Sequence, residues 1–170
     1  MSGHSKWHNI KFRKERVDAQ KGKIFSKMAK VIAMAARSGS QANLDEAVEK
    51  AKEANMPKIN IERAIKRGTG EEKTAALEEV TYEVIGPFGL GLLIETITDN
   101  KNRTLGEIKQ ILKKHNANLG GVSWMFENKN KPKYTITLTP QQREQVEKLF
   151  DELDEQEDAQ EIYSNLAENS

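Results

Sequence analysis

The opening of the chain combines cationic and aromatic side chains in a pattern that suits polyanion binding. Residues 1–40 contain ten Lys or Arg residues and two acids, a net charge of +8. Trp7, Phe12 and Phe25 are interleaved with these cations. Cations spaced along a backbone neutralise phosphates, and aromatic rings among them can stack on bases. The pattern predicts a nucleic-acid-binding surface, and a solvated basic arm is the simpler alternative.

Nine residues are the predicted phosphate and stacking contacts. They are Lys6, Trp7, Lys11, Arg13, Lys14, Lys21 and Lys23, with Lys66 and Arg67 as secondary candidates. Duplex DNA and structured RNA are not distinguished by these side chains, because both expose a phosphate backbone. The predicted partner is therefore nucleic acid, either DNA or ribosomal RNA, with the ribosome itself as one context.

A weaker anion contact is predicted at Lys101 and Arg103, which stand beside the start of an expected helix. The N–H groups of a first helical turn attract anions. Helix capping is the favoured account of the same stretch, with Asn102 or Thr104 as the N-cap and Glu107 completing a capping box with Thr104.

Catalytic and metal chemistry find little support in the sequence. His4 and His8 are four residues apart, as zinc ligands on a helix sometimes are, but no cysteine or nearby carboxylate completes a site. The glycine-rich stretch 86–91 lacks the Lys-Ser/Thr of a phosphate-binding loop and suits a tight turn between strands. We expect no enzymatic activity, metal, cofactor or small-molecule substrate. An enzyme or small-molecule sensor is the rival class, and a pocket with a titratable group of shifted pKa would favour it.

The charge of the chain is strongly asymmetric. Residues 140–170 carry a net charge of −8, in contrast to the basic opening. A third hypothesis is that this acidic end binds a basic partner such as a ribosomal protein. The absence of cysteine excludes disulfides and thiolate metal sites. No apolar run suits a signal peptide or a membrane span, so we expect a soluble, cytoplasmic protein without a membrane partner.

The N-terminal elements are predicted to be three short helices. Apolar residues recur with helical spacing over 18–38, and Gly39 ends that helix. Asn43 is the predicted N-cap of a helix over 44–54. Pro57 fits the first turn of a third helix that ends at Gly68. These helices form a predicted nucleic-acid-binding domain over residues 1–73.

The spacing of apolar residues changes in the remainder of the chain, which is predicted to be a second domain over residues 78–170. Strands are expected at 80–84, 90–96, 122–126, 134–138 and 159–166, with helices from about Leu105 and from Pro140. From Leu90 onward the order is βαββαβ, preceded by one extra strand. This order is that of a ferredoxin-like unit with both helices on one face of an antiparallel sheet, so the predicted fold class is α+β.

With these motifs identified, the chain resembles the YebC family of bacterial regulators, which is related to the mitochondrial translational activator of cytochrome oxidase subunit one. The matching stretches are Gly3-His-Ser-Lys-Trp, Asn9-Ile-Lys, Arg13-Lys, Lys21-Gly-Lys-Ile-Phe, Asn55-Met-Pro-Lys, Asn60-Ile-Glu-Arg-Ala-Ile-Lys-Arg-Gly-Thr-Gly, Tyr82-Glu, Gly86-Pro, Thr98-Asp-Asn, Asn102-Arg-Thr, Asn118-Leu-Gly and Met125-Phe. The resemblance implies a non-enzymatic nucleic-acid-binding factor. Family members have been described as DNA-binding regulators of transcription, which is the reading we favour, and others as ribosome-associated translation factors that help at proline-rich stretches.

The sequence departs from the family pattern in one respect. Members usually carry a further domain inserted after the strand that matches 122–126. Here residues 127–132 lead directly to the next expected strand. We therefore expect a short form in which 122–126 and 134–138 pair as a hairpin and close the sheet without the extra domain.

Overall fold

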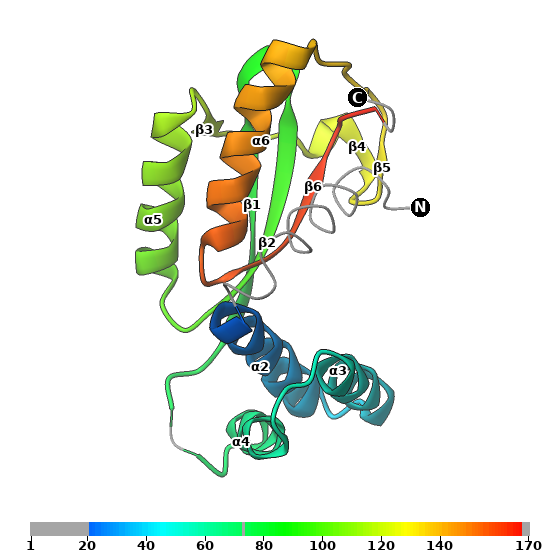
Figure 1. Ribbon diagram of the computed structural model, residues 1–170, viewed down its shortest axis with the longest axis vertical. Helices are drawn as coiled ribbons and strands as arrows, with labels where there is room; N and C mark the ends of the chain where they lie inside the picture. Colours follow the sequence, from blue (N-terminus) through cyan, green and yellow to red (C-terminus); the bar gives the residue numbers. More distant parts are fainter. Residues whose placement is uncertain (1–20, 73, 168–170) are drawn as a thin grey trace. The chain divides into compact units, whose positions relative to one another are not determined.

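The structure is a computed structural model that describes residues 21–72 and 74–167 (Figure 1). The chain divides into two compact units, with the boundary between residues 78 and 79. Each unit has its own apolar core.

The first unit is helical. Its elements are α2 (Lys21–Ser38), α3 (Gln41–Glu53) and α4 (Lys58–Thr69) (Figure 1). The helices bury one face each around Ile32, Ala51, Ile61 and Ala64. Burial of such an apolar stripe, rather than local propensity, supplies most of the stability of short helices. The three helices expected from the sequence are present.

The helix ends differ in detail from the prediction. Gly39, with φ at 75°, follows the end of α2 as expected. The N-cap of α3 is Ser40, whose side chain accepts a hydrogen bond from the Asn43 N–H, so the prediction of Asn43 as N-cap was wrong. Helix α4 continues through Gly68 and ends at Thr69, because Gly70 is the residue that adopts the left-handed conformation.

Gly68 has a packing role instead of a capping role. A Cβ at this position would lie 2.2 Å from the Ala33 carbonyl oxygen and 2.7 Å from the Ala36 Cβ. Only a residue without a side chain lets α4 approach α2 this closely. The glycine thus sets the distance between the two helices.

The second unit is an antiparallel sheet covered on one face by two helices. The strands β1 (Glu78–Ile85), β2 (Gly91–Thr98), β3 (Asn118–Leu119) and β6 (Ala159–Ser164) are ordered β3-β1-β2-β6. The helices α5 (Lys101–Lys114) and α6 (Pro140–Glu155) lie side by side over the sheet (Figure 1). Leu92, Ile94 and Ile162 of the sheet share a core with Ile108 of α5 and Phe150 of α6. The predicted α+β class, with helices first and the sheet after, is confirmed.

The opposite face of the sheet carries a smaller apolar cluster. Leu93 and Tyr163 pack there with Val122 and Phe126. The segment that supplies the last two residues contains a single turn, η2 (Ser123–Met125), and a short hairpin of β4 (Phe126–Asn128) and β5 (Lys131–Pro132).

The structure corrects the strand assignment in three places. Residues 122–126 form a turn and the start of β4. Val122 and Phe126 are buried, but Trp124, which strand alternation would place on the same face as both, is 61% exposed. Residues 134–138 form no strand and make one isolated bridge, from Ile136 to Leu166. β1, predicted as an extra strand, lies in the centre between β3 and β2, so the strand order expected for βαββαβ is not the observed one.

The predicted hairpin at the glycine-rich stretch is present. β1 and β2 are joined through the turn η1 (Pro87–Gly89), in which Leu90 N–H donates to the Pro87 carbonyl. Gly89 has φ at 81°, which glycine adopts without cost. Asn165 holds this turn from the end of β6, accepting from Gly91 N–H at 2.8 Å and donating to the Gly89 carbonyl at 3.1 Å.

Candidate nucleic-acid interface

Most of the predicted phosphate contacts fall at the start of the chain. Lys6, Trp7, Lys11, Arg13 and Lys14 lie outside the described residues, as do His4 and His8. Lys21 begins α2, and Lys23 is an exposed residue of its first turn. The roles of these residues in binding remain predictions.

Charge is unevenly divided among the three helices. α2 has five Lys or Arg residues and no acid, and α4 has four Lys or Arg residues and one acid. α3 instead has four acids and two lysines. Two of the α2 cations, Lys27 and Lys30, are buried, so they do not belong to a solvent-facing surface. The basic character of the unit resides in α2 and α4, and not in α3.

Helix α4 presents an exposed stripe that includes a residue the sequence reasoning missed. Ile59, Arg63 and Lys66 are exposed and follow one another at i, i+4 and i+7, which places them on one side of the helix. Ile59 is 64% exposed, unusual for a large apolar side chain beside cations. Lys66 was predicted as a secondary contact. Arg63 was not, although it lies three residues before Lys66, a helical spacing that places both cations on one side of α4.

Arg67 contacts the segment that follows α4. With Arg37, it lines a pocket formed by α2, the end of α4 and the connecting segment after it. Arg37 Nη1 donates to the Leu77 carbonyl at 2.6 Å, and Arg67 Nη2 lies 3.5 Å from the Ala75 carbonyl. Arg67 Nε is buried without a hydrogen-bond partner among the described residues. Both arginines tie the connecting segment to the helices.

Arg103, predicted as an anion contact, is engaged by carboxylates of its own unit. Its Nη2 donates to both Asp158 oxygens at 2.8 and 2.9 Å, and its Nη1 donates to Asp99 at 3.1 Å. The hydrogen bonds that Arg103 donates to Asp158 hold the pKa of Arg103 well above its ordinary range. The N-cap of α5 is Asn100, which accepts from Arg103 N–H, so neither Asn102 nor Thr104 is the cap. Lys101 is exposed, and its anion contact stays a prediction.

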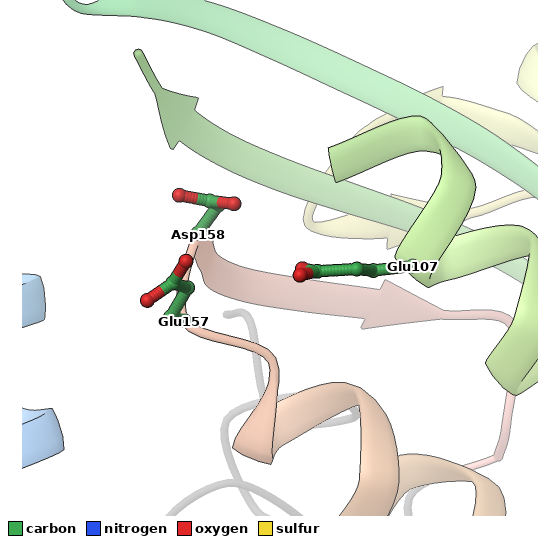
Figure 2. Close-up of side chains that lie close together, drawn as sticks. All are labelled: Glu107, Glu157 and Asp158. Atoms are coloured by element: carbon green, nitrogen blue, oxygen red, sulfur yellow. The ribbon is translucent and has the colours of Figure 1, made fainter. Parts of the chain in front are cut away.

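Three carboxylates lie close together at the same place. Ligand oxygens of Glu107, Glu157 and Asp158 all lie within 4.8 Å of one another (Figure 2). Internal donors already contact all three carboxylates: Arg103 reaches Asp158 and lies 3.5 Å from Glu157, and Gln156 Nε2 bridges Glu107 and Asp158 at 2.8 and 3.0 Å. The Thr104 hydroxyl donates to Asp158 at 2.8 Å. The cluster is accounted for as an ion-pair and hydrogen-bond network around the buried Asp158.

This network explains the shared stretch from Thr98 to Thr104. The Thr98 hydroxyl accepts from Asn100 N–H at 2.9 Å and lies 2.7 Å from the Thr104 hydroxyl. Five polar residues of the stretch therefore have an internal role in joining β2 to α5: Thr98, Asp99, Asn100, Arg103 and Thr104. Within the described parts of the chain, no helix has the length and apolarity that crossing a membrane requires.

Comparison with known proteins places both units in one family. Residues 5–71 match the model of the TACO1/YebC protein N-terminal domain, and residues 77–131 match that of the TACO1/YebC second and third domain. A conserved hypothetical protein from Aquifex aeolicus has a similar crystal structure, with a TM-score of 0.80 and 30% identity over 89% of this chain and 92% of that one.

Curated relatives carry a common name. A probable transcriptional regulatory protein of Dictyoglomus turgidum is 55% identical over 137 residues, which cover 76% of this chain and 55% of that protein. Another of the same name, from Thermoanaerobacter pseudethanolicus, is 38% identical over 238 aligned positions covering 98% of this chain and 97% of the relative. Because this chain has 170 residues, at least 68 of those positions are interior residues of the relative without a counterpart here.

The interior gap agrees with the expectation of a short form that lacks an inserted domain. The matches extend over the helical unit and into the sheet unit, and the relatives are named as regulators. The chain belongs to the TACO1/YebC family.

Proposed function

We propose that this protein is a non-enzymatic, nucleic-acid-binding regulatory factor, and that its target is DNA in the regulation of transcription. The observation that carries the proposal is the concentration of positive charge in the N-terminal part of the chain. Residues 1–77 have a net charge of +8, and residues 78–170 a net charge of −7. A chain polarised in this way directs one end toward a polyanion and keeps the other away.

The structured part of the proposed interface is the exposed side of α4. Arg63 and Lys66 supply charges that neutralise phosphates, and Ile59 adds apolar contact area between the phosphates or in a groove. The cations of the opening stretch, Lys11, Arg13 and Lys14 among them, are the further phosphate contacts in this proposal. Phosphate contacts of this kind position a protein without reading sequence.

The proposal does not involve catalysis. The strongest polar cluster of the sheet unit, around Asp158, is satisfied by Arg103, Gln156 and Thr104, so its groups serve the fold. The names of the relatives point in the same direction, since they describe regulators.

Charge reversal tests the proposal. Arg63→Glu with Lys66→Glu should weaken binding to a DNA duplex by at least tenfold at low salt, and should lower the slope of log affinity against log salt by roughly one unit per contact removed. Lys50→Glu with Lys52→Glu on α3 changes the net charge equally and is the matched control. Fluorescence anisotropy at several salt concentrations measures both.

The triple variant Lys11→Glu, Arg13→Glu and Lys14→Glu should abolish binding and leave the helical circular dichroism unchanged. Equal losses in the α3 control would show that only net charge matters, and undiminished binding in the triple variant would reject the interface. Crosslinking in cells with separate sequencing of bound DNA and RNA decides between a transcriptional target and ribosomal RNA, which presents the same phosphate chemistry.

A further inference from the structure

Among the described residues of the sheet unit, four large apolar side chains are exposed, and all belong to segments at one end of the sheet. Ile85 and Phe88 are 45% and 41% exposed at the turn between β1 and β2, and Trp124 and Tyr134 are 61% and 59% exposed. Gly120 packs against Ile85 and Gly91 against Met125, so the 120–125 segment lies beside that turn. Single exposed apolar residues are ordinary, but a group of them on one surface marks an interaction site.

Trp124 and Tyr134 form a pair within this group. Their ring centroids are 5.7 Å apart with an angle of 54° between the planes. Trp124 Nε1 donates to the Gly121 carbonyl at 3.2 Å, which fixes the indole without burying it. The pair is thus ordered and solvent-facing at once.

Glu83 of β1 holds the turn that carries Trp124. Its Oε1 accepts from Val122 N–H at 2.9 Å, from Ser123 N–H at 2.7 Å and from the Ser123 hydroxyl at 2.6 Å. On either side of the exposed indole, Val122 and Phe126 are buried. The exposed Trp124 ring adds little to core packing, although the turn that carries it is held firmly. A ring held in one position before a ligand arrives loses less conformational entropy on binding, so this arrangement suits a ligand.

Lysines flank the pair, and carboxylates hold two of them. Lys131 pairs with Glu127 at 2.8 Å, and Lys129 pairs with Glu95 at 3.1 Å and lies over the Tyr163 ring. Lys133 is exposed next to Tyr134, and its N–H donates to the Met125 carbonyl at 2.7 Å. Lys133 is therefore the cation of this segment that can meet an anionic partner beside the rings.

We propose that Trp124 and Tyr134 form a stacking platform for unpaired bases of single-stranded nucleic acid, with Lys133 contributing a phosphate contact. Aromatic rings beside cations bind single strands because every base has a stacking face that a duplex hides. The platform rests on the proposed nucleic-acid function and adds to it a second contact, on the other unit, that selects unpaired over paired strands.

Fluorescence of Trp124 gives a direct test. The chain has two tryptophans, so a Trp7→Phe background leaves Trp124 as the sole reporter. Titration with a mixed-sequence single-stranded RNA of about 12 nucleotides, a length within the site sizes of single-strand-binding folds, should quench its emission. A duplex of the same sequence should bind through the helical unit and leave the emission unchanged.

Substitutions then measure the contribution of the pair in the full chain, with Trp7 intact. Trp124→Ala should weaken single-strand binding about tenfold or more and leave duplex binding unaltered. Trp124→Phe and Tyr134→Phe keep a stacking ring and should retain most of the affinity. Far-UV circular dichroism checks that each variant is folded. Both rings are exposed, so their removal takes little packing from the core.

The outcomes separate the platform from the proposed function. If Trp124→Ala binds single strands and duplex as tightly as the parent does, and the parent binds duplex, the platform alone is rejected. Absence of any nucleic-acid binding by the parent would reject both proposals. A dimer of the parent that Trp124→Ala converts to monomer, measured by sedimentation, would instead identify the surface as an interface between copies and also reject the platform.

Discussion

At the scale of single residues, the most consequential contact is the pair of Arg103 and Asp158. Asp158 is fully buried and accepts hydrogen bonds from three side chains, Arg103, Thr104 and Gln156. A buried carboxylate without its counter-ion is strongly unfavourable, whereas a buried pair contributes little more than apolar residues would. The network joins the start of α5 to the start of β6, and its main effect is to fix that junction.

Removal of the counter-ion should therefore destabilise the sheet unit. We expect Arg103→Gln to lower the free energy of unfolding by about 3 kcal/mol, since it leaves Asp158 buried and unpaired. Urea unfolding followed by Trp124 fluorescence in a Trp7→Phe background measures the change. The double variant with Asp158→Asn should recover part of the loss, and a double variant as unstable as the sum of both singles would show that the two residues are not coupled.

Glu83 provides a pH-dependent contribution at the same scale. Hydrogen bonds from the Ser123 hydroxyl, then from the N–H groups of Val122 and Ser123, lower the pKa of Glu83 below its ordinary value of 4.5. A carboxyl with a lowered pKa in the folded state stabilises fully above the ordinary value, and the contribution disappears as the pH falls through the lowered one.

Glu83→Gln should accordingly cost about 1 kcal/mol at pH 7, because hydrogen bonds to a charged acceptor become neutral ones. The difference between parent and variant should shrink as the pH falls from 5 to 3, where the parent loses the same charge. Urea midpoints at several pH values provide the comparison. A difference that is constant with pH would contradict the assigned role of the carboxylate.

At the scale of elements, the helical unit depends on one close approach. Helices α2 and α4 meet at Gly68, where a Cβ would clash with backbone that cannot move aside easily. Overpacking of a tight contact typically costs 1–3 kcal/mol. This contact also sets the position of Lys66 and Arg67 relative to α2. The packing of α2 against α4 therefore affects the proposed interface.

Gly68→Ala should lower the stability of the helical unit by about 2 kcal/mol and weaken duplex binding in proportion to the unfolded fraction. Gly106→Ala in α5 is the control: nothing lies within 4 Å of the new Cβ, and the exposed helix should gain about 0.5–1 kcal/mol. Thermal denaturation followed at 222 nm records both. Opposite signs for the two glycines support the packing account, and a neutral Gly68→Ala would overturn it.

At the scale of the whole molecule, the sheet unit closes without the interior residues that longer relatives have. α6 and β6 come after the short β4–β5 hairpin, and they complete the core with Leu149, Phe150 and Ile162. Every residue of the two apolar clusters of this unit lies between Val84 and Leu166. A unit with its own core is expected to fold on its own.

A fragment of residues 78–170 should therefore fold cooperatively and retain a slow-exchanging sheet. Amide hydrogen exchange should be slow for Leu93, Ile94 and Ile162, which lie in the paired strands β2 and β6. Val122 and Ser123 should be intermediate, because their N–H groups are bound by Glu83 near the surface. Exchange that is uniformly fast across the fragment would show that the unit needs the missing residues or the helical unit.

The sequence by itself determined the elements that depend on local spacing. The apolar period predicted α2, α3 and α4, the glycine-rich turn predicted the β1–β2 hairpin, and Pro140 marked the start of α6. These features follow from a single face that is buried or a single backbone conformation that is required, and both are legible in neighbouring residues. The shared motifs also identified the family, and the charge asymmetry suggested the polyanion partner.

Only the tertiary structure decided which side chains meet across distance. The sequence predicted that Arg103 contacts an anionic ligand. In the structure, the pairing of β2 with β6 places Asp158, 55 residues later, beside Arg103. Residues 122–126 alternate in polarity like a strand. In the structure they form a turn instead, because Glu83 binds the Val122 N–H and because Val122 and Phe126 pack on Leu93 and Tyr163 of the sheet. The same turn exposes Trp124. A local pattern specifies which face of a segment is apolar, but the order of the strands determines what that face and the polar groups beside it contact.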